Sequence, residues 1–266
     1  MGEKPGDASP GTCSRDAITI VIPSRDESST LEKVLRECWE TCKNSLDIRM
    51  LVVDDASEDE TRAVLEKLSS ILPLKIVRND IPLGFGGSLK RGISLVETPW
   101  VTFTDGDDQY DPRDILRLFE ARGGPNKIIT GWRVRRADPP IRTFISIIFM
   151  IMNRIAFGLH MKDVTTSLKL GPTRAIQKIA PDVVFMNGSF WTEFMVRWRH
   201  AGLSIFEVPI THKPRRNYRS RVFEAGHIGR VIVHQFVGLM RLMHTVNASK
   251  RATLIQMTSD SVEHSR

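Results

Sequence analysis

The first regular segment of the chain reads AITIVI-PSRDE, from Ala17 to Glu27. Its mostly β-branched apolar run is typical of a buried strand, and the proline with the charged residues after it ends that strand in a loop. Apolar residues then recur every three or four positions from Leu31 to Cys42, which predicts an amphipathic helix. A strand that passes through a short loop into a helix is the repeating unit of an α/β fold.

This strand–helix unit repeats through the first half of the chain. Three further strands are predicted, a buried one at Ile48–Val53, a short one at Lys75–Val77 and a fourth at Trp100–Thr104. Two further helices are predicted, at about Ser57–Ser70 and at Ser88–Glu97. Ser57 and Glu60 have the spacing of a capping box, which would open the first of these helices. Such alternation predicts a mostly parallel sheet with helices on both faces.

The second half of the chain is less regular. Its predicted strands are Lys127–Thr130 and Leu203–Ile210, and its predicted helices are Ile141–Leu159, Ser189–His200 and Ile228–Val246. We expect one α/β domain over residues 17–222, followed by an amphipathic helix over residues 223–248. Polar composition predicts disordered tails at residues 1–16 and 249–266.

Composition excludes several classes of protein. The chain has 266 residues, a formal net charge of +7 and 41% hydrophobic residues, too many for a wholly disordered chain. No run of about 18 uncharged apolar residues predicts a membrane span, and the polar N-terminus lacks the apolar core of a signal peptide. The basic surplus would suit nucleic acid, but no recognisable DNA-binding motif is present, so we expect no nucleic-acid partner. Three cysteines without metal-binding spacing predict buried thiols and a cytoplasmic location.

Acidic residues follow three of the predicted strands. They are Glu27, the pair Asp54–Asp55 and the run Asp105–Asp108. The carboxyl ends of parallel strands meet at one edge of a sheet, where α/β proteins bind their ligands. Carboxylates gathered there would repel one another unless a positive group lay among them. One acidic turn is usually just a solvated turn, but three of them predict a site.

The run after the fourth strand reads Asp105-Gly106-Asp107-Asp108-Gln109. Residues i and i+2 of an extended segment project to one side, so Asp105 and Asp107 can share a ligand, while Gly106 allows close approach of the backbone. Two carboxylates and an amide oxygen from Gln109 suit Mg²⁺ or Mn²⁺, which adds water and substrate phosphate to its shell. An Asp-x-Asp phosphatase is the weaker interpretation, because its nucleophile follows the first strand.

The pair Asp54–Asp55 leaves two interpretations open. Acidic residues at the start of a helix interact favourably with the helix dipole, whereas carboxylates in dinucleotide-binding folds hydrogen-bond the ribose. The spacing of Gly84, Gly86 and Gly87 matches neither the dinucleotide fingerprint nor the phosphate-binding P-loop, so by itself it indicates little.

Five motifs in this order resemble glycosyltransferase family 2 with the GT-A fold, and especially its dolichol or polyprenyl phosphate mannose synthase branch. They are VIPSRDE (Val21–Glu27), VVDDAS (Val52–Ser57), LGFGG (Leu83–Gly87), TDGDDQ (Thr104–Gln109) and FEVPI (Phe206–Ile210). The resemblance covers Ala17 to about Val222. It implies a Rossmann-like, mostly parallel sheet flanked by helices, with C-terminal amphipathic helices, and a metal-dependent inverting transfer of a hexose from a GDP- or UDP-sugar.

The same resemblance implies which residues form the site. The residues that it implies bind the nucleotide-sugar are Pro23, Arg25, Glu27, Asp54, Asp55, Gly84, Lys90, Asp105, Arg215, Ser220 and Arg221. The metal ligands are Asp105, Asp107 and Gln109, and the catalytic residues are Asp107, Arg133 and Arg215. On the acceptor side lie Arg133, Asp163 and Glu193.

The chain departs from this branch after its last predicted strand. The mannose synthases carry a Gly-x-Ser-Lys segment there, whereas this chain has Tyr218 in place of the glycine and Arg221 in place of the lysine. Because arginine binds phosphate through two parallel hydrogen bonds, the charge that a diphosphate needs is retained. A solvated basic loop is the alternative. Asp26 and Ala56 also replace the usual Asn and Gly of the family.

The acceptor determines what catalysis requires. A hydroxyl of a saccharide or small molecule needs a carboxylate base, for which Glu193 is the candidate. A polyprenyl or dolichyl phosphate is already ionised and needs cationic side chains instead. Arg133 and the basic residues after it precede the apolar segment Phe144–Phe157, a pattern that fits a lipid-phosphate site at a membrane surface. A buried core helix is the alternative for that segment.

We therefore expect an enzyme with a lipid-phosphate acceptor, bound peripherally at the cytoplasmic face of a membrane. The C-terminal helix would dock on lipid, on a membrane-anchoring partner or on a second copy of the chain. A non-catalytic nucleotide-sugar-binding or scaffolding protein is disfavoured, because the Asp-x-Asp pair is intact.

Overall fold

The computed structural model describes residues 16–134, 140–214 and 233–246. They form a seven-stranded sheet in the order β3-β2-β1-β4-β6-β5-β7. The strands are β1 (Ala17–Ser24), β2 (Asp47–Asp54), β3 (Leu74–Arg78), β4 (Trp100–Phe103), β5 (Lys127–Arg133), β6 (Lys169–Pro172) and β7 (Ser204–Ile210). Only β6 runs antiparallel to its neighbours, β4 and β5, which confirms the expected mostly parallel sheet.

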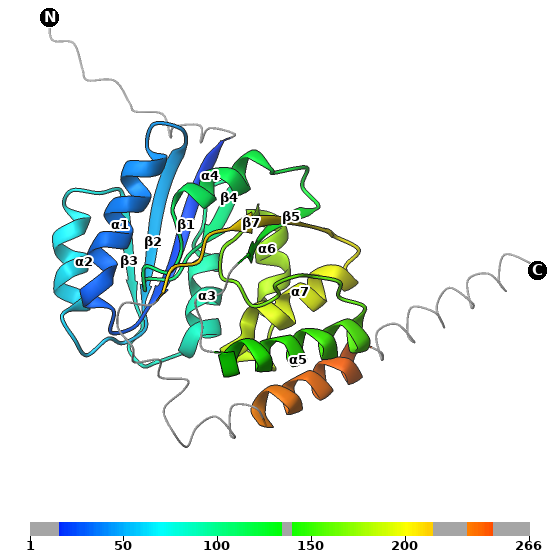
Figure 1. The fold of residues 1–266 in the computed structure, drawn as a ribbon. Helices are drawn as coiled ribbons and strands as arrows, with labels where there is room; N and C mark the ends of the chain where they lie inside the picture. The colour runs from blue at the N-terminus through cyan, green and yellow to red at the C-terminus, as the bar shows by residue number, and fades with distance from the viewer. Residues whose placement is uncertain (1–15, 135–139, 215–232, 247–266) are drawn as a thin grey trace, which may run out of the picture.

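Helices cover both faces of the sheet (Figure 1). They are α1 (Ser28–Cys42), α2 (Thr61–Ser69), α3 (Gly84–Ser94), α4 (Arg113–Glu120), α5 (Pro140–Phe157), α6 (Thr173–Ile179) and α7 (Phe190–His200). Residues 233–246 form a further helix, called here the C-terminal helix. Because side chains alternate along a strand, Ile18, Ile20 and Ile22 of β1 join the core under α1, α2 and α4, while Val21 joins the core under α3, α6 and α7.

Two predicted helix starts are wrong. The capping box does not form: α2 begins at Thr61, and Glu60 makes no side-chain capping bond. Ser57 Oγ instead accepts a hydrogen bond of 2.9 Å from the backbone N–H of Asp26, so it joins two loops. Helix α3 begins at Gly84 rather than Ser88. The short elements α4, β6 and α6 were not predicted, because so few residues carry little periodic pattern.

Helix α5 and the C-terminal helix each bury one side and expose the other. Phe157 of α5 and Leu239 and Leu242 of the C-terminal helix belong to the same core cluster, and the two helices lie near each other in Figure 1. The core-helix alternative for the segment Phe144–Phe157 therefore holds for one side of the helix, and the membrane-surface alternative stays a prediction. The exposed apolar residues of the two helices are Ile147, Ile148, Ile151, Ile155, Val233, Phe236, Val237 and Met240, called here the apolar face.

Other predictions concern the ends of the chain and the thiols. In the described ranges, no helix is both long and apolar enough to cross a membrane. Residues 1–15, 223–232 and 247–266 lie outside these ranges, so the predicted tails and domain boundaries stay predictions. Cys38 and Cys42 are buried free thiols, as expected, and burial raises the pKa of both, that of Cys42 to about 12.

Candidate active site

The loops after β1 and β4 meet at the point where the strand order reverses. From β1 the chain proceeds to β2 and β3 on one side, and then crosses to β4 on the other. Ligands of open α/β sheets bind at such a point. Thr30 Oγ1 donates a hydrogen bond of 2.7 Å to the carbonyl of Gly106, and a Cβ on Gly106 would lie 2.3 Å from Glu27 Oε2. Only glycine therefore allows the Glu27 carboxylate to approach the β4 loop so closely.

Backbone strain is concentrated at the same edge. In the described ranges, the non-glycine residues with positive φ are Asp26 (51°), Ala56 (55°) and Asp108 (63°). One lies in each acidic loop, after β1, β2 and β4. Side-chain-bearing residues rarely adopt this conformation, and it gathers at functional sites where the surrounding structure enforces it.

Asp55 and Asp54 have different surroundings. Asp55 accepts hydrogen bonds from Asn79 Nδ2 (2.7 Å), Leu83 N (2.7 Å) and Gly84 N (2.9 Å). Burial acts to raise the pKa of Asp55, but the hydrogen bonds outweigh it, so the pKa lies below its ordinary value and the group stays ionised. Asp54 is 1% exposed and bonds Ser57 N and the Arg78 guanidinium, so it stabilises the β2 loop from within.

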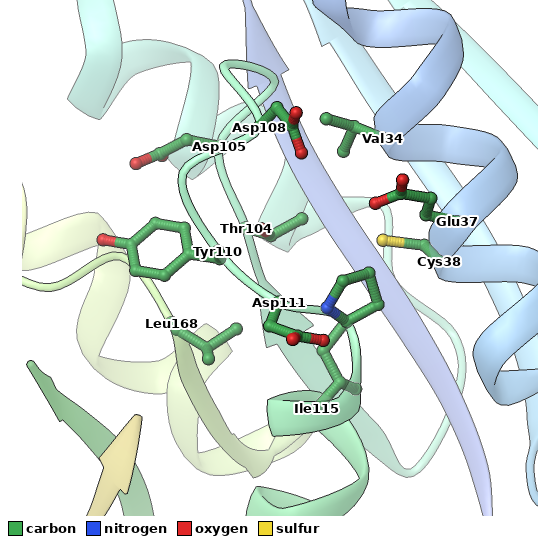
Figure 2. Close-up of a pocket in the computed structure, with 11 residues that line it drawn as sticks. Val34, Glu37, Cys38, Thr104, Asp105, Asp108, Tyr110, Asp111, Ile115 and Leu168 are labelled. Carbon is green, nitrogen blue, oxygen red and sulfur yellow. The ribbon is translucent and has the colours of Figure 1, made fainter. Parts of the chain in front are cut away.

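The acidic side chains of the β4 loop point in different directions. Figure 2 shows the carboxylate of Asp105 on the side of Tyr110 and that of Asp108 turned toward α1. Asp108 is paired with Lys33 there and lies 3.7 Å from Lys213 Nζ. Asp107 Oδ1 accepts from the N–H of Gln109 at 3.2 Å. The Asp108 carboxylate thus pairs with lysines from α1 and from the segment after β7. It points in a different direction from that of Asp105, a predicted metal ligand.

The predicted metal ligands suit a hard divalent cation. Gln109 Nε2 donates to the carbonyl of Lys213 at 3.2 Å, which leaves its Oε1 as the atom able to bind a cation. With two carboxylates, this makes an all-oxygen donor set of the kind that Mg²⁺ and Mn²⁺ prefer. Among the described residues no group of three or more His, Cys, Asp or Glu side chains could hold a metal, so a diphosphate or water would have to complete the shell.

Two of the predicted acceptor-side residues, Arg133 and Asp163, form a buried ion pair. Arg133 Nε and Nη2 donate to the two oxygens of Asp163 at 2.6 and 3.0 Å, and Nη2 also bonds Thr165 Oγ1 at 2.8 Å. The side chains are 8% and 2% exposed. Beside the pair, a hollow opens between α5 and the segment 162–165. The structure thus brings two predicted acceptor residues together at one hollow.

Glu193, the third predicted acceptor residue, is bound on all sides. It is fully buried and accepts hydrogen bonds from the N–H groups of Val184, Phe185 and Met186 and two from the Arg197 guanidinium, at 2.7 to 3.1 Å. A carboxylate that already accepts five hydrogen bonds is poorly placed to take a proton from a substrate.

The remaining predicted site residues are scattered. Pro23 lies buried in β1. Arg25 follows it, and its Nε is buried without a hydrogen bond in the described part of the chain. Lys90 Nζ, on α3, donates to the carbonyl of Val183 at 3.1 Å. Arg215, Ser220 and Arg221 lie outside the described residues.

Three contributing residues were missed by sequence reasoning. Asn79 donates to Asp55, Asn187 hydrogen-bonds the turn that contains Gly84, and Lys169 donates to the carbonyl of Val164, which lines the hollow beside Arg133. None stands in a recognised motif. The glycine spacing around Gly84 was the one hint that another group approaches that turn closely.

Lys169 should make stability depend on pH. Fully buried, it donates to Thr130 Oγ1, Val164 O and Thr166 O, and burial lowers its pKa to about 7 from 10.5. Between about pH 7 and pH 10.5, Lys169 is largely neutral in the folded chain but still protonated in the unfolded chain. The free energy of unfolding therefore rises with pH over this range.

Relative to Lys169→Met, the unfolding free energy of the wild type should therefore gain up to about 1.4 kcal/mol per pH unit above pH ~7. Urea denaturation of both proteins from neutral to mildly alkaline pH measures this difference. Parallel curves for the two proteins would contradict it.

The chain is similar in sequence to known glycosyltransferases. The model of the family Glycosyl transferase family 2 matches residues 19–191, more than half of the chain. The glycosyltransferase AglD of Haloferax volcanii is 26% identical over 213 residues, which are 74% of this chain but 33% of that protein. The dolichol-phosphate mannosyltransferase of Pyrococcus furiosus is 24% identical over 250 residues, 85% of this chain and 69% of that one. The chain thus spans a third of the length of one of these relatives.

Among solved structures, glucosyl-3-phosphoglycerate synthase of Mycobacterium tuberculosis in complex with UDP has a TM-score of 0.64 at 17% identity. The match covers 84% of this chain and 80% of that one. The same synthase has been solved with Mn²⁺ and UDP together. At 17% identity, this similarity shows that the two proteins share a fold, and no more than that.

Proposed function

The chain belongs to glycosyltransferase family 2, and from that premise we propose that it transfers a hexose, with inversion, from a GDP- or UDP-sugar to a polyprenyl or dolichyl phosphate. Relatives at about 25% identity include a dolichol-phosphate mannosyltransferase. The acceptor class rests on one observation above all, the mixed lining of the hollow beside Arg133.

The two walls of this hollow differ in chemistry. Helix α5 contributes mostly apolar side chains, and the segment 162–165 contributes mostly polar or charged ones. The lining consists of Ser146, Ile147, Phe149, Met150, Lys162, Asp163, Val164 and Thr165. A lipid phosphate has the same two parts, an apolar chain and an anionic head, so it would contact both walls.

The donor would bind at the edge where β1, β2 and β4 end. Asp55 would accept hydrogen bonds from the nucleoside, and Asp105, Asp107 and Gln109 would hold Mg²⁺ or Mn²⁺. When bound, the ion supplies positive charge that stabilises a leaving diphosphate. The Nε of Arg25 is buried without a hydrogen bond, 3.9 Å from Asp26 Oδ2, and is a further donor that an anionic ligand would satisfy.

The state of the acceptor-side carboxylates favours an ionised acceptor. Asp163 is paired with Arg133, and Glu193 accepts five hydrogen bonds, so neither is placed as a general base. A phosphate needs no deprotonation at neutral pH. Arg133, oriented by Asp163, would attract the acceptor phosphate.

A panel of sugar-labelled GDP- and UDP-sugars tests the proposal. Each is incubated with the protein, Mn²⁺ and vesicles that contain polyprenyl phosphate, and the lipid-extractable label is counted. Label should enter the lipid with polyprenyl phosphate and not with the matched polyprenol. Transfer to soluble saccharides only would support the hydroxyl-acceptor alternative, and no turnover of any donor would refute the enzyme.

The apolar face should bind a membrane surface. Neither α5 nor the C-terminal helix contains an acidic residue, so an anionic bilayer would not be repelled. Ile151 and Ile155 are 47% and 81% exposed. The double substitution Ile151→Asp, Ile155→Asp removes apolar contact and adds negative charge.

It should lower sedimentation with anionic vesicles by about tenfold or more. Ile71→Asp is the control, because Ile71 is 57% exposed and lies outside the apolar face. Equal losses for both variants would contradict a specific lipid surface.

A further inference from the structure

Residues 184–189, called here the strap, connect the region after α6 to α7 and are held firmly at both ends. The carboxylate of Glu193 in α7 accepts hydrogen bonds from the N–H groups of Val184, Phe185 and Met186, the first three strap residues. At the other end, Gln235 of the C-terminal helix donates to Ser189 Oγ. A Cβ on Gly238 would lie 2.9 Å from Met186 Cγ, so the C-terminal helix packs tightly on the strap.

Within the strap, Asn187 hydrogen-bonds the glycine-rich turn twice. Its Nδ2 donates to the carbonyl of Leu83, and its Oδ1 accepts from the N–H of Gly87, each at 2.9 Å. A Cβ on Gly84 would lie 2.7 Å from Asn187 Nδ2, and one on Gly86 would lie 2.5 Å from Asn187 Oδ1. Gly86 is required because a Cβ there would also lie 2.8 Å from the backbone oxygen of Asn187, and Gly84 because its φ is +74°.

The opposite side of the same turn holds Asp55. The N–H groups of Leu83 and Gly84 donate to the two Asp55 oxygens at 2.7 and 2.9 Å. Leu83 therefore bonds Asn187 through its carbonyl and Asp55 through its N–H. Any shift of the turn would rotate or release the Asp55 carboxylate.

We infer that Asn187 is a positioning residue for donor binding: it fixes the glycine-rich turn, and the turn fixes the Asp55 carboxylate for the nucleoside. The inference rests on the proposed function, in which Asp55 contacts the donor. Asn187 acts at a distance from the reacting atoms, so its loss affects binding rather than the chemical step.

Gln177 of α6 provides a matched control, because it also hydrogen-bonds backbone near an end of α3. Its Nε2 donates to the carbonyls of Ile93 and Val96, each at 3.0 Å, at the opposite end of α3. Gln177→Ala and Asn187→Ala thus each remove one amide that makes two hydrogen bonds near an end of α3. Only the second lies beside Asp55.

The two variants are compared in titrations with GDP and UDP in the presence of Mn²⁺, and then in transfer assays. Asn187→Ala should raise the nucleotide Kd and the donor KM about tenfold, with kcat within about twofold of the wild type. Asn187→Asp, which can still accept from Gly87 N–H, should lie between. Gln177→Ala should leave Kd and KM unchanged. Equal values for the two alanine variants would overturn the inference.

Amide hydrogen exchange provides a readout that needs no donor. Asn187→Ala should accelerate exchange at Leu83 and Gly84, whereas Gln177→Ala should not. Unchanged exchange in Asn187→Ala would overturn the inference even if nucleotide binds. If exchange responds but wild-type protein binds neither GDP nor UDP, the proposed function fails, and the donor-binding role of Asn187 fails with it.

Discussion

Asp107→Ala is expected to lower metal-dependent turnover of the nucleotide-sugar by about 10²–10³-fold while the protein stays folded. Loss of one group that stabilises developing charge in a closed site has this magnitude. The fold should survive because the hydrogen bond that Asp107 Oδ1 accepts from the N–H of Gln109, at 3.2 Å, lies within its own loop. Transfer rates over a Mn²⁺ titration measure the loss, and thermal unfolding checks the fold.

Asp108→Asn is the matched control for this prediction. Asp108 is the next residue, is equally acidic, and has a positive φ that asparagine also tolerates. Its carboxylate is turned toward α1 and away from Asp105 (Figure 2). Its replacement should therefore change turnover only a few fold. Equal inactivation of both variants would show that the charge of the loop, rather than a particular ligand, supports the activity.

Glu193→Ala is expected to lower the free energy of unfolding by about 3–5 kcal/mol. The substitution leaves three backbone N–H groups and the Arg197 guanidinium, 17% exposed, without their carboxylate. Breaking a buried ion pair by removing one partner has this cost. Urea denaturation measures it.

The exposed pair Arg62–Glu66 is a control with the same i,i+4 spacing. Its side chains are 67% and 61% exposed, so Glu66→Ala should cost less than about 1 kcal/mol. Glu193→Gln separates the two roles considered for Glu193. A general base would lose kcat in this variant at little cost in stability. A structural residue would lose stability, while the folded fraction keeps its transfer rate.

Sequence patterns correctly placed the acidic loops after β1, β2 and β4 at one edge of the sheet, because strand direction alone brings them together. Once Ala17–Ile22 and Trp100–Thr104 are taken as parallel strands, the acidic residues after them must lie at one edge. Gly106 was assigned a close approach, and the structure brings the Glu27 carboxylate against it. Patterns were weaker where another segment decides the outcome: α2 begins at Thr61 because Ser57 bonds Asp26 rather than the helix.

The fold class and the edge that carries the site follow from local order along the chain, since hydrophobic periodicity and strand direction are properties of short segments. The partner that each side chain bonds does not follow from local order. Asp54 and Asp55 are neighbours of the same type, yet one bonds Arg78 and the other holds the glycine-rich turn. Glu193 was predicted as an acceptor-side acid from sequence, and the structure surrounds its carboxylate with five hydrogen bonds. Only tertiary packing decides such roles, because the groups that surround a buried carboxylate come from segments far apart in the chain.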